Sequence, residues 1–304
     1  MPIKKSIKNN DLIVLLVDKF KEFYLRYFIS DEKLLNKRFK QRLGREVNLE
    51  NPVKFNDKLQ WLKLYWDDPL ATKCADKYEV RGFIKETVGD KYLNELLGVY
   101  ESVDEIGIDE LPKSFVLKGT HGSGFNIVCK DKNKMDWKKE FKKMKRWLRY
   151  NYYWSKREWV YRDIKPRIIC EAFLSDDMLN STSLHDYKFY CFNGIPYYCQ
   201  VIKGRDNNET IDFFNMNWEH MPFTGMRPLA NSKEKIEQPK NYEEMILLAR
   251  KLSQDFPFVR VDFYYVNNKI YFGELTFFPT SGMGQFYPPE WNRKIGNLLE
   301  LPKN

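Results

Sequence analysis

The stretch from Val259 to Gly282 holds two carboxylates that one divalent cation could bind together. It consists of two runs rich in β-branched and aromatic residues joined by residues 267–269, which predicts a β-hairpin. If the connection is an odd-length loop of about three residues, Asp262 and Glu274 lie directly opposite each other, with Cβ atoms about 5 Å apart. Thr276 then points to the same face as Glu274, because side chains alternate along a strand.

Asp262, Glu274 and Thr276 would form an oxygen-rich patch, which suits Mg²⁺. That ion prefers oxygen ligands and is usually held by one or two carboxylates together with substrate phosphates. The alternative is a half-exposed hairpin with ordinary outward-facing polar residues, since acidic residues are depleted in strands but not rare there. The stretch alone leaves both interpretations open.

The composition limits the class of protein. Of the 304 residues, 43% are apolar and 16% aromatic, which is ample for a packed core in one large or two smaller domains. The net charge is +9, but the 51 Lys and Arg are interleaved with 42 Asp and Glu, so we expect no nucleic-acid partner. The five cysteines lack C-x-x-C spacing, which indicates reduced, buried cysteines in a cytoplasmic protein, and the three histidines give a zinc site little to build on.

The N-terminal region predicts helices. Residues 12–17 are an apolar run far shorter than the roughly 20 residues that cross a bilayer, and we expect neither a membrane span nor a signal peptide. Residues 11–28 have the pattern of an amphipathic helix capped by Asp11. We expect its aromatic residues to pack on the protein, with a peripheral membrane contact as the alternative. These aromatic residues are Phe20, Phe23, Tyr24 and Tyr27.

A second helical pattern covers residues 55–66, where the apolar side chains recur at 4, 3, 4 spacing and predict a core helix. The next stretch is more polar and again helical in pattern. Its Lys77 and Arg81 fall one helical turn apart on the same face. From composition alone, both are expected to be solvated surface charges.

Residues 115–130 read as strand, glycine-bearing turn and strand. Glycines in the turn permit positive φ and close backbone approach, so the loop could direct its N–H groups toward phosphate oxygens. Neither the Walker order nor G-x-G-x-x-G occurs here, and an ordinary tight turn is the alternative. The residues that could contact phosphate are Lys118, His121, Gly122, Ser123 and Gly124.

A helix capped by Asp136 is predicted to continue to Asn151, with one apolar stripe and one strongly basic face. Such a face is usually solvated, and an anionic polysaccharide, lipid or nucleic-acid surface is the alternative, which salt-dependent binding would distinguish. Its basic residues are Lys138, Lys139, Lys142, Lys143, Lys145, Arg146 and Arg149.

Residues 167–174 predict a further strand, and two more strands are joined at Asn193–Gly194, a strong hairpin signal. Asp186 and Lys188 alternate with aromatic residues in the first strand of this hairpin, so both point away from its apolar face. Arg205 lies just beyond the second strand.

The order of these features resembles the ATP-grasp fold. It comprises a lysine on a strand, a glycine-rich hairpin, a strand ending in Glu-x-Phe, Asp-x-Lys on a hairpin, a downstream Arg, and VDF with a Glu twelve residues later. Within that fold, the chain resembles the TupA-like ATP-grasp family, linked to bacterial cell-surface polymer synthesis, over approximately residues 50–288. The segments that carry this resemblance are NPVKFNDKLQWLKLY, ADKYEVR, LPKSFVLKGTHGSG, DYKFYCFNG and FGELTFFPTSG.

The resemblance implies a mixed α/β (α+β) protein in which two α+β subdomains grip ATP. We expect a helical N-terminal region at 1–100, a lid-like subdomain with the phosphate loop at 101–180, and a C-terminal subdomain with the metal-binding hairpin at 181–304.

The resemblance also implies roles for single residues. Lys77 and Lys118 are expected to reach the ATP phosphates, and the loop at 122–124 to cover them. Backbone groups of Cys170 to Phe173 would hold the adenine, while Glu171 would accept from its amino group or from the ribose.

Three further residues are implied to face the triphosphate and the reacting carboxylate. They are Asp186, Lys188 and Arg205, of which the last two are expected to be catalytic. Lys188 stands where many ATP-grasp enzymes have arginine, and it supplies charge without a bidentate fork. Thr276 stands where asparagine is common, so its hydroxyl or a water is the expected third metal ligand.

The implied activity is that of an ATP-dependent carboxylate–amine ligase with ATP and Mg²⁺ as cofactors. Phosphoryl transfer to a carboxylate would be followed by attack of an amine, giving an amide, ADP and phosphate. For this family the expected substrates are a uronic-acid-containing surface polymer or its precursor and an amino acid or peptide. The resemblance also leaves open a peripheral contact of this protein with the inner face of the membrane or with polysaccharide machinery.

Two other classes of function stay open. One is a phosphotransferase or glycosyltransferase acting on a surface glycan, although no D-x-D triplet supports a sugar-nucleotide metal site. The other is a non-catalytic anion-binding module that uses the basic helix at 138–149. ADP release that depends on both a carboxylate and an amine would separate the ligase from these.

Overall fold

The computed structural model describes residues 11–175, 184–204 and 208–303. Its helices are α2 (Asp11–Tyr27), α3 (Asp31–Leu43), α4 (Phe55–Tyr65), α5 (Pro69–Ala75), α6 (Val80–Thr87), α7 (Trp137–Leu148), α8 (Tyr152–Lys156), α9 (Tyr242–Ser253) and α10 (Trp291–Gly296). Its strands are β1 (Leu96–Tyr100), β2 (Phe115–Gly119), β3 (Asn126–Cys129), β4 (Ile168–Ala172), β5 (Asp186–Phe192), β6 (Ile195–Lys203), β7 (Thr210–Phe214), β8 (Thr224–Gly225), β9 (Phe258–Val266), β10 (Lys269–Thr276) and β11 (Phe286–Tyr287).

A four-stranded antiparallel sheet has the order β1-β4-β2-β3. Its β2–β3 hairpin confirms the strand–turn–strand prediction for residues 115–130. α7 covers one face of this sheet, where Phe115 stacks on Trp137 with ring centroids 5.7 Å apart. The side chain of Asp136 accepts a hydrogen bond from the Lys139 amide, so the predicted cap of this helix is confirmed.

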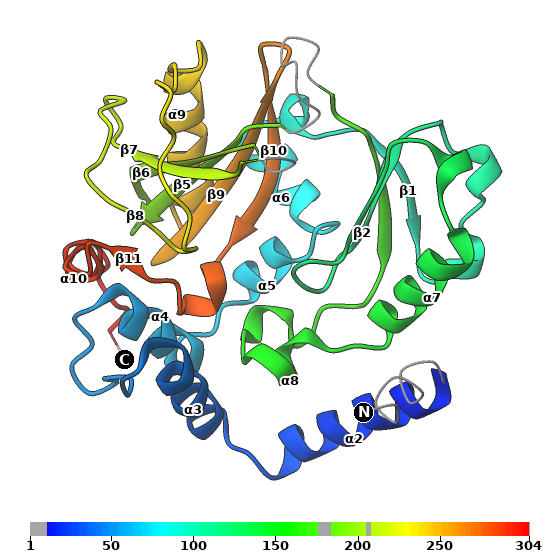
Figure 1. Cartoon of the computed structure of the whole chain (residues 1–304), viewed down its shortest axis with the longest axis horizontal. Helices are drawn as coiled ribbons and strands as arrows, with labels where there is room; N and C mark the ends of the chain where they lie inside the picture. The colour runs from blue at the N-terminus through cyan, green and yellow to red at the C-terminus, as the bar shows by residue number, and fades with distance from the viewer. Residues whose placement is uncertain (1–10, 176–183, 205–207, 304) are drawn as a thin grey trace.

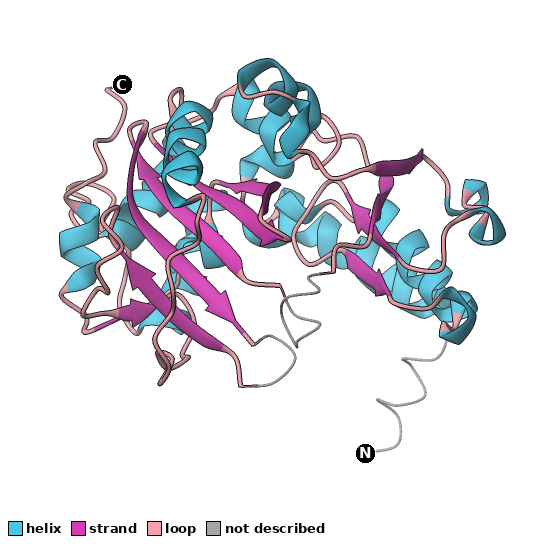
Figure 2. Ribbon diagram, turned by 90° about the horizontal axis from the view of Figure 1, so that it is seen from above, coloured by secondary structure: helices cyan, strands magenta, loops and turns pink. Residues whose placement is uncertain are grey.

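A five-stranded antiparallel sheet has the order β10-β9-β5-β6-β7. β5 lies in its middle and is buried along its whole length. The predicted hairpin between β5 and β6 is confirmed, because Asn193 and Gly194 form the turn with φ of 48° and 80°. α9 packs on this sheet through an apolar face that includes Met245, Leu248 and Leu252. Figures 1 and 2 show the two sheets on opposite sides of the molecule, with α5 and α6 between them.

The hairpin of β9 and β10 brings Asp262 opposite Glu274, as predicted, but by a different route. The predicted three-residue loop is wrong: Val266 pairs with Lys269 across a two-residue turn. That turn alone would place Glu274 one residue out of register with Asp262. A bulge at Gly273 restores the pairing, and a Cβ there would lie only 3.0 Å from the Asp262 carbonyl oxygen.

α4 is a core helix, as its spacing predicted, and it also holds the segment that follows β10. Residues 280–282 have φ of 51°, 56° and 67°, the left-handed region that side chains other than glycine rarely adopt. Buried side chains of α4 donate to the carbonyl oxygens of this segment. The contacts are Asn56 Nδ2 and Gln60 Nε2 to Gly282 at 2.9 and 3.1 Å, and Lys63 Nζ to Ser281 at 2.8 Å.

α2 forms where the amphipathic pattern predicted it, but its aromatic residues do not pack on the protein. The helix buries Leu25, while large apolar side chains on its other face remain exposed. The expectation that this aromatic stripe belongs to the core is therefore wrong. The exposed stripe comprises Leu16, Val17, Phe20, Phe23, Tyr24 and Tyr27, and continues to Phe28. Within the described part of the chain, no helix is both long and apolar enough to span a membrane.

Candidate functional site

The glycine-rich loop between β2 and β3 is closely packed. A Cβ on Gly122 would lie 2.9 Å from the ring of Phe125 and 3.0 Å from that of Tyr152, so the loop requires a glycine there. Gly124 has a φ of 78°, which also favours glycine. From the other side, Lys77 Nζ donates to the Gly122 carbonyl oxygen at 2.6 Å. The predicted phosphate-binding lysine and the predicted phosphate loop are therefore in direct contact.

Two neighbouring loop residues have different surroundings. His121 is buried, and its Nε2 donates to the Trp147 carbonyl oxygen at 2.8 Å, since a carbonyl can only accept. Burial lowers the pKa of His121, so the ring is neutral at pH 7 and fastens the loop to the end of α7. Ser123 instead lines a cavity next to the metal hairpin.

Lys118, at the end of β2, is part of a charged network with β4. Its Nζ lies 2.6 Å from Glu171 Oε2, and Arg81 Nη1 lies 3.2 Å from Glu171 Oε1. Only 17% of the Arg81 side chain is exposed, so the expectation that Arg81 is a solvated surface charge is wrong. Glu171 is thus held between two cations, one of which lines a large cavity.

This first cavity, of about 800 Å³, has room for a nucleotide. Its lining includes four residues predicted to bind ATP: Lys118, Glu171, Phe173 and Asp186. The side chain of Cys170 points the other way, into the core between the small sheet and α7. Because β4 lies between β1 and β2, the backbone of Cys170 is paired on both sides. The end of β4 beyond Ala172 is therefore the part of the predicted hinge with backbone groups available to adenine.

The three predicted metal ligands converge on a single cationic nitrogen. Arg260 Nη2 lies 2.6 Å from Asp262 Oδ2, 3.3 Å from Glu274 Oε1 and 3.1 Å from Thr276 Oγ1. These oxygens are of the kind that Mg²⁺ prefers, and in this structure the guanidinium of Arg260 binds them. Among the residues that the structure describes, no group of three or more His, Cys, Asp or Glu could hold a metal ion, so ATP oxygens would complete the shell.

Lys188 adds a second cation to this cluster. Its Nζ contacts Asp262 Oδ2 and lies 3.2 Å from Asp186 Oδ1. Burial would raise the pKa of Glu274, but the positive charges of Lys77, Lys188 and Arg260 outweigh it and lower that pKa to about 2. Glu274 is therefore ionised at neutral pH, as a metal ligand must be.

A second cavity, of about 610 Å³, is lined by part of this cluster. Ser123, Arg260, Glu274 and Thr276 line it, so the glycine-rich loop and the β9–β10 hairpin share one space. The first cavity reaches the same sheet through Asp186 and Tyr264.

Arg205, predicted to be catalytic, lies outside the described residues. Arg260 and Arg81 were not predicted to belong to the site. A signal for Arg260 existed, because it lies two residues before Asp262 on the same strand and so faces the same side. Arg81 depends on a contact with a residue 90 positions away, for which the sequence gives no local signal.

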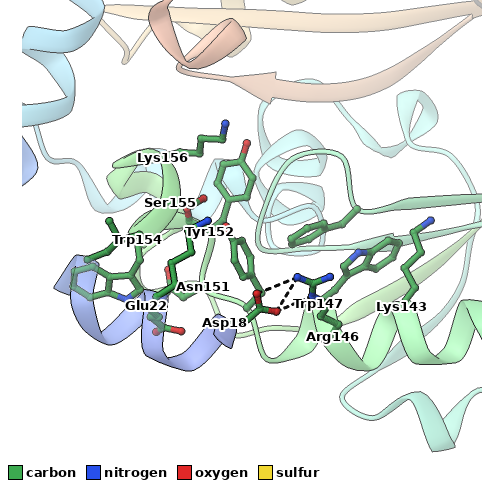
Figure 3. Close-up of a pocket in the computed structure, with 14 residues that line it drawn as sticks. Asp18, Glu22, Lys143, Arg146, Trp147, Asn151, Tyr152, Trp154, Ser155 and Lys156 are labelled. Atoms are coloured by element: carbon green, nitrogen blue, oxygen red, sulfur yellow. Dashed lines mark hydrogen bonds and ion pairs between the residues drawn. The ribbon is translucent and has the colours of Figure 1, made fainter. Parts of the chain in front are cut away.

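A third cavity, of about 400 Å³, lies between α2 and the helices α7 and α8 (Figure 3). It contains none of the predicted metal ligands or catalytic residues. Asp18 of α2 accepts from Arg146 of α7 at 2.8 Å across it, so α2 is docked through its polar edge.

The sequence matches the model of a known family. A family described as TupA-like ATPgrasp matches residues 57–300. A search of curated proteins gave no match.

Solved structures with a similar arrangement are distant in sequence. D-alanine–D-alanine ligase from Bacillus anthracis is 14% identical, with 82% of this chain and 83% of that chain covered and a TM-score of 0.44. The enzyme of the same name from Helicobacter pylori is 13% identical, with 82% and 70% covered and a TM-score of 0.40. The ADP complex of N5-carboxyaminoimidazole ribonucleotide synthetase is 13% identical, with 73% and 50% covered and a TM-score of 0.39.

Proposed function

Since the chain belongs to the TupA-like ATP-grasp family and has a mixed α/β fold, we propose that it is an ATP-dependent carboxylate–amine ligase. One observation carries this proposal: the oxygens of Asp262, Glu274 and Thr276 surround one cationic nitrogen, and Glu274 and Thr276 line the second cavity. A nucleotide in the first cavity would place its phosphates between the glycine-rich loop and this cluster. An acceptor carboxylate in the second cavity would then meet the terminal phosphate.

The chain's own residues suit phosphoryl transfer to a carboxylate. Lys77 and Lys118 would bind the phosphate oxygens, with Lys118 exchanging its contact to Glu171 for one to ATP. Bound Mg²⁺ would neutralise the charge that builds on the transferring phosphoryl group. Arg260 and Lys188, both next to Asp262, would hold the acceptor carboxylate and the transferring group in line.

The proposed reaction has two steps. An oxygen of the acceptor carboxylate attacks the γ-phosphorus and the bond to the bridging oxygen breaks, which gives an acyl phosphate and ADP. The amine then attacks the acyl carbon, phosphate leaves with the electrons of the C–O bond, and the nitrogen loses a proton. We assign the acceptor to a uronic-acid-containing surface polysaccharide or its precursor, and the amine to an amino acid or peptide.

Trapping the intermediate tests this function. With ATP, Mg²⁺ and galacturonate but no amine, hydroxylamine should intercept the acyl phosphate and yield the hydroxamate. When an amino acid replaces hydroxylamine, ADP release should depend on the presence of galacturonate. Phosphorylation of a neutral sugar hydroxyl, without hydroxamate formation, would instead indicate the alternative phosphotransferase.

We further infer that α2 attaches the protein to the surface of an anionic bilayer. Its exposed stripe of aromatic and aliphatic residues lies opposite the docked side that carries Asp18 and Leu25. Lys19, Lys21 and Arg26 border the stripe. Apolar residues flanked by basic ones are typical of helices that lie in the headgroup region, where each basic residue near the surface contributes about 1 kcal/mol.

Replacing Phe20 and Phe23 together by Glu is expected to reduce vesicle binding about tenfold or more, because the substitutions remove two aromatic rings from the exposed stripe. Co-sedimentation with phosphatidylglycerol vesicles measures this, and neutral phosphatidylcholine vesicles should bind the unaltered protein less. ADP release should not change. Equal binding of both proteins, or dimerisation of the unaltered protein without vesicle binding, would assign the stripe to another partner.

A further inference from the structure

The second cavity has a group of cationic side chains that phosphoryl transfer does not use. Besides the hairpin residues, its lining includes Arg38 and Arg42 of α3 and Lys156 at the end of α8. Arg38 and Arg42 are four residues apart and so lie on one face of the helix. Figure 1 shows α3 and α8 below the segment that follows β10, with α8 on the side of the small sheet.

These cations have no carboxylate partner within the described part of the chain. None of Arg38, Arg42 and Lys156 forms an ion pair there, whereas Arg157 pairs with Asp31 at 2.9 Å. Burial and the nearby charge of Arg157 lower the pKa of Arg38, so its guanidinium is held where positive charge is disfavoured. Several uncompensated cations around one cavity indicate an anionic ligand.

The acidic residues of the cavity are already engaged elsewhere. Glu274 contacts Arg260 in the metal cluster. The charge of Glu158 is balanced first by the buried Lys63 and then by a bond to Ser281, and Lys156 contributes less than either. The positive charges of α3 and α8 are therefore available to a bound molecule.

α3 is fixed firmly enough to act as a binding element. Ser30 caps its start, and Gly44, with a φ of 71°, ends it. Leu35 and Phe39 are buried against Met283, which follows the strained segment after β10. The helix lies ahead of residues 57–300, so it is outside the region that matches the family.

We propose that Arg38, Arg42 and Lys156 form a subsite for a second anionic group on the acceptor, separate from the carboxylate that reacts. The inference rests on the proposed function, since it takes the second cavity as the acceptor site. Guanidinium groups bind carboxylates and phosphates in a bidentate manner, so the group is either the carboxylate of a neighbouring sugar acid or a sugar phosphate. A cavity of about 610 Å³ has room for more than one sugar unit.

Calorimetric binding in the presence of ADP and Mg²⁺ tests the subsite with three probes. Galacturonate carries one anion, trigalacturonate adds neighbouring carboxylates, and galacturonate 1-phosphate adds a phosphate. The unaltered protein should bind at least one of the larger probes about tenfold tighter than galacturonate. The R38Q/R42Q double variant should lose this preference, and K156Q should reduce it. K37Q, on an exposed position of the same helix, is the matched control and should keep it.

Each outcome has one meaning. A gain with trigalacturonate alone assigns a carboxylate, and a gain with galacturonate 1-phosphate alone assigns a phosphate. Equal binding of all three probes by the unaltered protein, or an unchanged preference in the double variant and K156Q, overturns the subsite. Binding is measured without turnover, so the ligase and the subsite can fail separately. If the variants lose the preference but the unaltered protein releases no ADP, the subsite stands and the ligase is refuted. If the unaltered protein releases ADP but the variants keep the preference, the ligase stands and the subsite is refuted.

Discussion

Replacing Asp262 by Asn is expected to lower turnover about 10²- to 10³-fold while the protein stays folded. The substitution keeps the size of the side chain but removes one negative charge from the proposed metal shell, so the phosphoryl group is less well neutralised and aligned. Magnesium-ATP should raise the melting temperature of the unaltered protein and do so much less in the variant. Turnover is measured as ADP release.

The same substitution is expected to lower the melting temperature of the ligand-free protein. Two facing carboxylates alone would repel and predict the opposite. In the structure, however, Asp262 bonds to Arg260 at 2.6 Å and contacts Lys188, so its loss leaves two buried cations less compensated. Asp212→Asn is the matched control, because Asp212 is equally buried in β7 but remote from the hairpin. It should lose stability and keep turnover. Normal turnover in Asp262→Asn would mean that this hairpin has a structural role and no part in catalysis.

Lys118→Ala is expected to weaken ATP binding by about tenfold to a hundredfold, since a charge-assisted contact contributes roughly 1.5–3 kcal/mol. The variant also removes one of the two partners of Glu171 and should therefore melt at a lower temperature. Calorimetric titration with ATP on the folded variant measures the affinity.

Arg81→Ala separates these two effects. It removes the other partner of Glu171, at 3.2 Å, but Arg81 does not line the nucleotide cavity. Both variants should lose stability, Arg81→Ala the more because Arg81 Nη2 also donates to the Asn94 carbonyl oxygen at 2.7 Å, and only Lys118→Ala should lose affinity for ATP. If both variants lost the same affinity for ATP, Lys118 would act through the network around Glu171 and not through a contact with phosphate.

Local sequence patterns predicted the hairpins and most of the helices, because the alternation of apolar and polar side chains and the turn residues involve only neighbouring positions in the chain. They also placed Asp262, Glu274 and Thr276 on one face. The register was predicted correctly but the turn length was not, because Gly273, in the interior of a strand, was not taken as the sign of a bulge.

The remaining parts of the site rest on contacts between distant segments. Lys77 reaches Gly122 across 45 residues, and no periodicity reports such a meeting. The exposed stripe of α2 was misjudged for a related reason. Amphipathicity says that a helix has an apolar face, but not whether that face turns toward the protein, and here Asp18 and Leu25 anchor the opposite side.

The clamp of α4 on the segment after β10 also sets an order of assembly. Gln60 leaves the ribosome 222 residues before its partner Gly282, so this contact closes one of the longest loops in the chain. Until it closes, residues 280–282 lack the buried donors of α4 that bind their carbonyl oxygens in the left-handed conformation. The proposed acceptor side of the site can therefore form only after residues 280–282 have been made, whereas the glycine-rich loop, which closes over far fewer residues, can form early. During synthesis, the glycine-rich loop would therefore form long before the proposed acceptor site.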